Sequence, residues 1–216
     1  MVVRIDKERT ENSKLKEFWK WLWDSDSWLS YLVFLMIVFI FVKFIFLPGL
    51  GLIFGTALPL AIVESSSMDH NILDETGINE ICGTVFNKTG FLSSDAYWDT
   101  CGNWYESNTN ITKEQFNEFK FKNGFRKGDL IIIFGKKSSD IKIGDVIIFN
   151  AGRNHPIIHR VISLSPLQTK GDHNPGQLTE EKTINENQVV GVAVAKIPYI
   201  GWVKLIFFEI TKKFSS

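Results

Sequence analysis

A single apolar stretch near the N-terminus sets the strongest limit on how this chain can fold. From Leu29 to Leu47 the sequence is apolar apart from Ser30 and Lys43. A helix of this length is roughly 28 Å long, which is enough to cross the hydrocarbon core of a bilayer. The run is too long for the apolar region of a cleavable signal peptide, and no small-residue cleavage site follows it promptly. We therefore expect a retained transmembrane anchor over residues 28–50.

Positive charge is distributed unevenly around this stretch. Six lysines and arginines precede it, whereas none follows Lys43 until Lys88. By the positive-inside rule, residues 1–27 are predicted to be cytoplasmic and the rest of the chain to lie outside the cell membrane, on a single-pass anchor. Apolar residues within 1–27 fall at helical spacing, so we expect a short amphipathic helix on the membrane surface there.

The composition excludes several classes of function. Lysines and arginines number 24 and so do aspartates and glutamates, which gives a formal net charge of +0 and no basic field for nucleic acid. The four histidines form no HxxxH pair, and neither of the two cysteines has a CxxC or other zinc-ligand spacing. We therefore expect no nucleic-acid partner, no metal site and no organic cofactor.

Short β-branched runs dominate the second half of the chain. Gly-Asp turns precede the first two, and an Asn-Pro-Gly turn separates the last two. This pattern predicts a mainly β fold, with a small, mostly antiparallel β domain over residues 56–200 carried on the one N-terminal helix. Residues 201–216 are apolar but few and include Lys204, which favours a tail at the membrane interface over a second span. The runs lie at residues 130–134, 146–149, 157–164 and 189–197.

Residues 69–123 interrupt this pattern. They are polar, rich in Asn, Thr, Ser and Glu, and have no strong hydrophobic period, so we expect an insertion or lid and not part of the core. Cys82 and Cys101 both lie in this segment. An extracytoplasmic location favours a disulfide between them, closing a loop of about 18 residues and contributing ~3 kcal/mol, whereas two separately buried thiols are the alternative.

A cluster of serines follows the first β-branched run of the predicted domain. Ser65–Ser67 end the run that begins at Leu60, and a strand that stops at a small polar residue often presents that residue at a site. A serine needs a neighbouring base to become a nucleophile. His159, within the run 157–164, and Asp172, within a Gly-Asp turn, supply the base and the acid of a Ser-His-Asp triad.

Each of these residues also has an ordinary structural explanation. Three serines in a row are typical of a turn in which the hydroxyls bond to the local backbone. A histidine at position 159, in an aliphatic strand, is compatible with a buried, hydrogen-bonded core residue. His173 and Lys170 lie beside Asp172 and compete for the role of the base, although a turn histidine and a solvated lysine are the simpler interpretations.

Five segments occur in a fixed order along the predicted β domain. Together they resemble one family, the type I signal peptidases, in the branch that comprises archaeal and endoplasmic-reticulum enzymes. The resemblance extends to the anchor and to the tail at Pro198–Trp202. The five segments are SSSM from Ser65, RKGD from Arg126, KIGDVIIF from Lys142, IIHRV from Ile157 and TKGDHN from Thr169.

The resemblance implies a serine endopeptidase that removes signal peptides from exported precursors after small residues. It implies that Ser67, directly before a methionine, is the nucleophile. His159 is implied as the general base, in the position where the bacterial branch has a lysine, with Asp172 supporting it. Many relatives carry a second aspartate a few residues after the Gly-Asp pair. Residues Pro175–Leu178 offer none, so Asp172 is expected to serve alone.

The resemblance also implies where a substrate binds. Ser65 and Met68 are expected at the oxyanion and substrate site, and Leu60 and Ile62 lie on the strand to which an extended signal peptide would add. The implied partners are the signal peptides of secretory precursors and membrane lipid, and the protein translocation channel is a candidate. An archaeal source is consistent with this branch.

Two other functions fit the same pattern. One is a non-catalytic, single-pass surface module that binds extended peptides on the same fold, and the other is a related protease for a different exported precursor. An enzyme requires that the serine, the histidine and the acid converge, with roughly 3 Å between each bonded pair of atoms. A scattered arrangement would favour the binding module.

Overall fold

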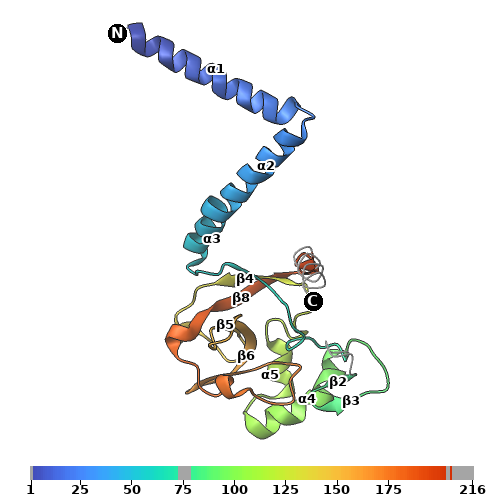
Figure 1. Ribbon diagram of the computed structural model, residues 1–216. Helices are drawn as coiled ribbons and strands as arrows, with labels where there is room; N and C mark the ends of the chain where they lie inside the picture. The colour runs from blue at the N-terminus through green and yellow to red at the C-terminus, as the bar shows by residue number, and fades with distance from the viewer. Residues whose placement is uncertain (1, 73–78, 203–204, 206–216) are drawn as a thin grey trace. The chain divides into compact units, whose positions relative to one another are not determined.

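Two units make up the chain, residues 1–50 and residues 51–216, each with its own internal contacts. The computed structural model describes residues 2–72, 79–202 and 205, and of residues 2–12 the backbone alone (Figure 1). The first unit begins with helix α1, Val2–Asp24, so the helix expected near the N-terminus is present and is longer than predicted. Its position relative to a membrane surface stays a prediction.

A long apolar helix follows. Its first part is α2, Trp28–Phe41, whose first turn is capped by the Ser27 hydroxyl accepting from the Leu29 N–H. A π-helical turn, η1, Val42–Phe46, leads into α3, Leu47–Phe54. Trp28–Phe54 is the one helix within the described residues that is long and apolar enough to cross a membrane.

Pro48 and Gly49 lie inside this helix and do not end it. Proline lacks an N–H and its ring crowds the carbonyl of the fourth residue before it. The chain widens into the π turn immediately before the proline, where the Leu47 N–H bonds to the Val42 carbonyl. Single π turns let a helix continue past such a residue.

The second unit is built on an antiparallel sheet of six strands, which confirms the predicted mainly β fold (Figure 1). The order across the sheet is β1-β4-β8-β5-β6-β7, and every neighbouring pair is antiparallel. The strands are β1, Leu60–Ile62; β4, Leu130–Phe134; β5, Val146–Phe149; β6, Ile157–Leu164; β7, Leu167–Lys170; and β8, Val189–Ile197. Short helical turns η2, Ser138–Asp140, η3, Thr179–Glu181, and η4, Glu186–Gln188, lie in the connections.

Strand β5 is buried on both faces because successive side chains of a strand point to opposite sides. Val146 and Ile148 pack into one hydrophobic cluster, together with Met68, Phe125 and residues of β4. Ile147 and Phe149 pack into a second cluster with residues of β6 and β8. The two clusters lie on either side of the sheet, so its centre is buried on both faces.

The segment between Asp69 and Asn123 is a small packed structure, so the expectation that it contributes no core is wrong. It contains the hairpin β2, Glu80–Ile81, and β3, Thr84–Val85, followed by helices α4, Ser94–Asn108, and α5, Lys113–Glu118. A disulfide joins Cys82 to Cys101. The segment forms a hydrophobic cluster of its own with one residue of β6. The buried residues of this cluster are Ile72, Ile81, Leu92, Tyr97, Trp98, Cys101, Tyr105, Ile111, Phe116 and Ile162 of β6.

Gly201 and Trp202 contact the turn that precedes strand β4. The Gly201 N–H bonds to the Gly128 carbonyl at 2.8 Å. A side chain at Gly128 would overlap the ring of Trp202. Most of the predicted interfacial tail, residues 201–216, lies outside the described residues.

Candidate active site

The serine cluster follows directly on strand β1. Backbone bonds from Val63 N–H to Asp129 O and from Gly128 N–H to Val63 O continue the pairing of β1 beyond its last residue. The chain then turns, and the Asp69 N–H closes this turn on the Ser66 carbonyl. This turn places the Ser67 hydroxyl 2.9 Å from Nε2 of His159 and 3.2 Å from the Ser65 hydroxyl.

His159 bridges the serine to a carboxylate. It lies on β6 opposite Ile147 of β5, and only 2% of the residue is exposed. Its Nδ1 contacts Oε1 of Glu181 in a short hydrogen bond. With the Nδ1 proton donated to Glu181, Nε2 is free to accept the proton of the Ser67 hydroxyl. Ser67, His159 and Glu181 therefore form one hydrogen-bonded chain, in the arrangement of a serine-protease triad.

Glu181 is fully buried and is held by two further groups. The Thr169 hydroxyl of β7 donates to Oε1 at 3.0 Å, and the backbone N–H of Leu178 donates to Oε2 at 2.7 Å. The residue closes the turn η3. The sequence pattern does not point to Glu181, because the second acid is expected within Pro175–Leu178 and Glu181 lies three residues beyond Leu178. A longer side chain allows an acid further along the chain to reach the same histidine.

The expectation that Asp172 supports His159 directly is not met. The Asp172 carboxylate lies against Arg160, whose Nε and Nη2 donate to it at 2.9 and 2.6 Å. His70 and the Tyr105 hydroxyl bind the same carboxylate at 3.1 and 3.2 Å. His159 and Arg160 are neighbours on β6 and point to opposite faces. The acid that pairs with Arg160 is therefore on the other side of the strand from the His159 ring.

The Asp172 carboxyl remains charged. Burial alone would raise its pKa, but the Arg160 guanidinium and the hydrogen bond from His70 outweigh burial and hold the pKa well below its usual range. Burial lowers the pKa of His70. Nδ1 of His70 is the one buried side-chain nitrogen or oxygen without a partner in the described part of the chain. Asp172 and Arg160 thus form a buried ion pair on the face of β6 opposite the His159 ring.

Glycine is required at position 171 because three groups converge on it. A side-chain carbon there would lie 2.7 Å from each of His159 Nε2, the Ser67 carbonyl oxygen and the Asn174 side chain. Two residues further on, the backbone N–H of His173 donates to the Ser67 carbonyl at 3.0 Å. The ring of His173 is turned away from Ser67, and its Nδ1 lies 3.0 Å from the Asp69 carbonyl. His173 therefore does not take the place of His159.

A cavity of about 280 Å³ opens beside the nucleophile. Ser65, Ser66 and Ser67 line one side, and Glu80, Ile81 and residues His173–Pro175 line the rest. Ser65 therefore lines the cavity next to Ser67, and its role in substrate binding stays a prediction. A larger cavity, of about 1060 Å³, lies between the insertion and the β6–β7 hairpin and includes none of the three bonded residues.

The structure separates the other three predicted substrate residues. Leu60 and Ile62 are half-buried on β1, which lies at one end of the sheet order and pairs with β4 alone among the described strands. Met68 is buried in the core, and its sulfur accepts the Asp172 N–H at 3.4 Å. The Met68 side chain thus faces the protein interior and not the cavity. Among the described residues no three His, Cys, Asp or Glu side chains are grouped to hold a metal ion.

Comparison with known proteins finds similar chains but no matching family model. No protein-family model matches the chain. A signal peptidase complex catalytic subunit SEC11 from Chaetomium globosum is 30% identical over 98 residues, covering 39% of this chain and 57% of the relative. The protein of the same name from Pyrenophora tritici-repentis is 31% identical over 99 residues with the same coverage. The chain is similar to signal peptidase catalytic subunits.

This similarity confirms the resemblance to signal peptidases. The chain spans little more than half the length of these signal peptidase subunits. Both organisms are fungi, so these relatives do not support the expected archaeal source. The long helix before the β domain is in keeping with membrane anchoring.

Proposed function

We propose that this protein is a membrane-anchored serine endopeptidase that removes signal peptides from exported precursors. The observation that carries the proposal is the continuous hydrogen-bonded chain from the Ser67 hydroxyl through His159 to Glu181. A non-catalytic peptide-binding module would need none of these contacts. The similarity to signal peptidase catalytic subunits supplies the class of substrate.

The geometry suits a two-step acyl transfer. The Ser67 oxygen attacks the carbonyl carbon of the scissile peptide while Nε2 of His159 takes the hydroxyl proton. The carbon–nitrogen bond then breaks, and His159 returns the proton to the leaving amine. Water hydrolyses the resulting ester with the histidine acting again as base. Glu181 fixes the ring tautomer and stabilises the imidazolium form in each step.

Two further roles in substrate binding follow from position. The Ser65 hydroxyl, 3.2 Å from the Ser67 oxygen, is the side-chain donor we assign to the developing oxyanion. A donor of this kind contributes about 3 kcal/mol to transition-state stabilisation. Among the described strands β1 pairs with β4 alone, so its other edge offers backbone groups of Leu60 and Ile62 to an extended signal peptide. Asp172 acts through Arg160 and the turn at Gly171, without touching substrate.

We also propose the orientation of the chain. Trp28–Phe54 anchors it in the membrane, the lysine- and arginine-rich N-terminal segment lies in the cytoplasm, and the β domain lies outside it. A Cys82–Cys101 disulfide is in keeping with an oxidising compartment. In this orientation the candidate partners are signal peptides, membrane lipid and the protein translocation channel.

Cleavage of a secretory precursor by the detergent-solubilised full-length protein tests the proposal. We expect wild type to cut after a small residue, and Ser67→Ala and His159→Ala to lower the rate by on the order of 10⁴-fold or more. Ser139→Ala is the matched control, since this exposed serine binds the neighbouring Asp140 and does not line the cavity. Full activity in Ser67→Ala would show that another residue is the nucleophile and would reject the proposal.

A further inference from the structure

The turn Gly171–His173 lies between the candidate catalytic pair and the insertion. On one side, Gly171 packs so closely that a side-chain carbon would come within 2.7 Å of both His159 Nε2 and the Ser67 carbonyl oxygen. The N–H of His173 binds the same Ser67 carbonyl at 3.0 Å. The position of this turn therefore sets how the backbone of Ser67 sits relative to the His159 ring.

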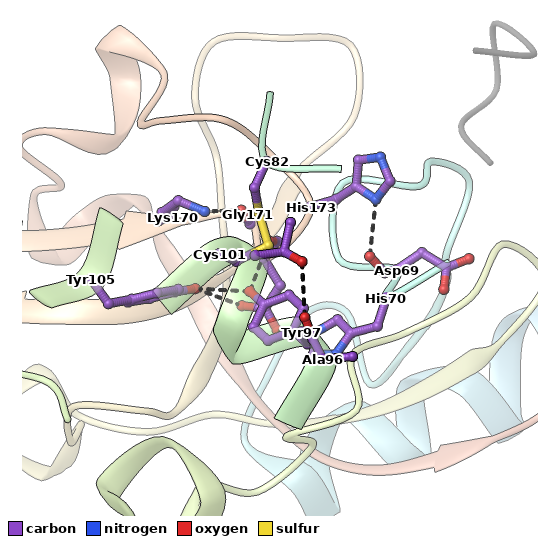
Figure 2. Close-up of a disulfide and its surroundings, with 12 residues drawn as sticks. Asp69, His70, Cys82, Ala96, Tyr97, Cys101, Tyr105, Lys170, Gly171 and His173 are labelled. Carbon is purple, nitrogen blue, oxygen red and sulfur yellow. Dashed lines mark hydrogen bonds and ion pairs between the residues drawn. A yellow bond between two sulfur atoms is a disulfide. The ribbon is translucent and has the colours of Figure 1, made fainter. Parts of the chain in front are cut away.

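On its other side, the turn is held through its carbonyl groups (Figure 2). The Tyr97 hydroxyl of α4 donates to the Asp172 carbonyl at 2.8 Å, and the backbone N–H of Cys82 donates to the His173 carbonyl at 2.9 Å. Two different elements of the insertion thus bind successive carbonyls of the turn. Each of these groups is a part of the insertion and not of the sheet.

The third carbonyl of the turn, that of Gly171, accepts a hydrogen bond from a side chain of the sheet. Aromatic residues of the insertion surround that side chain. The Lys170 ammonium donates to the Gly171 carbonyl at 2.9 Å. It lies 5.1 Å from the ring centres of both Trp104 and Tyr105, which belong to α4. Aromatic faces attract a desolvated ammonium, so the position of α4 also determines where this lysine is held.

The disulfide connects the two elements that bind the turn. Cys82 lies between β2 and β3, strands of two residues each, and Cys101 lies in α4 one helical turn beyond Tyr97. A two-stranded hairpin of this size is marginal on its own. The covalent bond fixes the Cys82 N–H in relation to Tyr97, and the Cys82 sulfur lies 3.3 Å from the Asp172 carbonyl oxygen.

We propose that the disulfide-closed insertion is the positioning element of the catalytic pair, so that cleavage depends on the oxidised state of Cys82 and Cys101. This inference rests on the proposed function. Glu80 and Ile81 of the insertion line the cavity beside Ser67, but no hydrogen bond among the described residues joins the insertion to the Ser67 hydroxyl or the His159 ring. It acts through the turn Gly171–His173, and opening the disulfide loosens the bonds from Cys82 and Tyr97 that keep the turn against Ser67.

The test compares the oxidised full-length protein with the double variant Cys82→Ser/Cys101→Ser, both in detergent. One measurement is hydrogen exchange of the backbone amides of residues 171–174, which reports the turn directly. The other is the kcat and KM for a precursor peptide, with and without a thiol reductant. Exchange in β5 serves as the internal standard for an intact sheet, since this strand lies in the centre of the fold.

We expect the amides of the turn to exchange at least tenfold faster in the double variant while β5 stays protected. The kcat should fall roughly tenfold or more, because small displacements of reacting groups are costly, with KM changed far less. Reductant should bring wild type to the same values and leave the variant unaffected. Tyr97→Phe, which removes one bond to the turn, should lower kcat with the disulfide intact. Thr100→Val, on the same helix, should not, since its hydroxyl binds only the Ala96 carbonyl.

Unchanged kcat in the double variant would overturn the inference, whatever the exchange rates. Unchanged exchange of the turn would overturn it as well, because any loss of activity would then have another origin. If the oxidised protein cleaves no precursor although the exchange difference is found, the proposed function fails and the coupling between disulfide and turn stands. The two failures are therefore distinguishable.

Discussion

The carboxylate of Glu181 lies on the Nδ1 side of the His159 ring, opposite the nitrogen that faces Ser67. The two residues are 22 positions apart in the sequence and come from different elements, the strand β6 and the turn η3. A carboxylate in this position selects the tautomer that leaves Nε2 free to accept a proton. Four predictions concern this site and the buried residues packed next to it.

The first concerns the acid that supports the histidine. Glu181→Gln should lower kcat by on the order of 10³-fold or more, because an amide no longer fixes the ring tautomer or stabilises its cationic form. Glu180→Gln is the matched control, since the neighbouring carboxylate binds Arg153 at the surface. Steady-state cleavage kinetics of both variants decide the matter. A wild-type rate in Glu181→Gln would return the role to another acid.

The second concerns the buried ion pair of Asp172 and Arg160. Asp172→Asn should cost about 3–5 kcal/mol of unfolding free energy, since it leaves the guanidinium buried without its partner. The pKa of Asp172 is depressed, so the pair contributes fully above the unfolded value of about 3.9 and its contribution is lost as the pH falls below that value. Denaturant unfolding between pH 5 and pH 2 should therefore show a shallower acid slope in the variant than in wild type. Equal slopes would contradict the assignment.

The third concerns Lys170. Burial lowers its pKa to about 8, although Asp172 and Glu181 act to raise it and Arg160 adds to the lowering. The unfolded lysine titrates near 10.4, so between about pH 8 and pH 10 the unfolded chain binds more protons and this residue makes stability rise with pH by about 1.4 kcal/mol per unit. Lys170→Met should remove that rise, and Lys182→Met, an exposed lysine, should keep it. Urea unfolding at several pH values measures the difference.

The fourth concerns the crowded glycine. Gly171→Ala should lower kcat about 10²-fold, because the added carbon displaces either the His159 ring or the Ser67 backbone. Gly176→Ala, in the same connection, is the control, since its nearest neighbouring atom would be at an ordinary 3.6 Å. Comparison of kcat and of the melting temperature separates misplacement of the pair from general loss of stability. An active Gly171→Ala protein would show that the turn tolerates movement.

The sheet was predictable from the sequence because its signals are local. Strands β4, β5, β6 and β8 have the bounds of the β-branched runs, each separated from the next by glycine-containing turns. Glu181 was not predictable in the same way, since its role depends on how β7 and η3 fold back onto β6. Asp172 had the expected sequence position but not the expected partner, because the alternation along β6 sends Arg160 to its side.

The insertion shows another limit of sequence patterns. Tyr97, Trp98, Cys101 and Tyr105 recur at the spacing of one helix face, but polar residues between them lower the average hydrophobicity of α4. The sequence pattern of this segment therefore indicates a lid without a core. The sequence does not decide between a disulfide and two separate thiols, since pairing depends on the distance between residues that only the fold brings together.

The shortness of strand β1 limits how strongly copies of this protein can associate through the edges of their sheets. β1 spans three residues and pairs with β4 alone among the described strands, and the open edge of a strand can recruit the edge of a neighbouring molecule. Short edge strands offer too few backbone groups for two folded copies to associate stably in this way. A protein concentrated in the plane of a membrane can thus keep an open edge for a flexible chain and still resist self-aggregation.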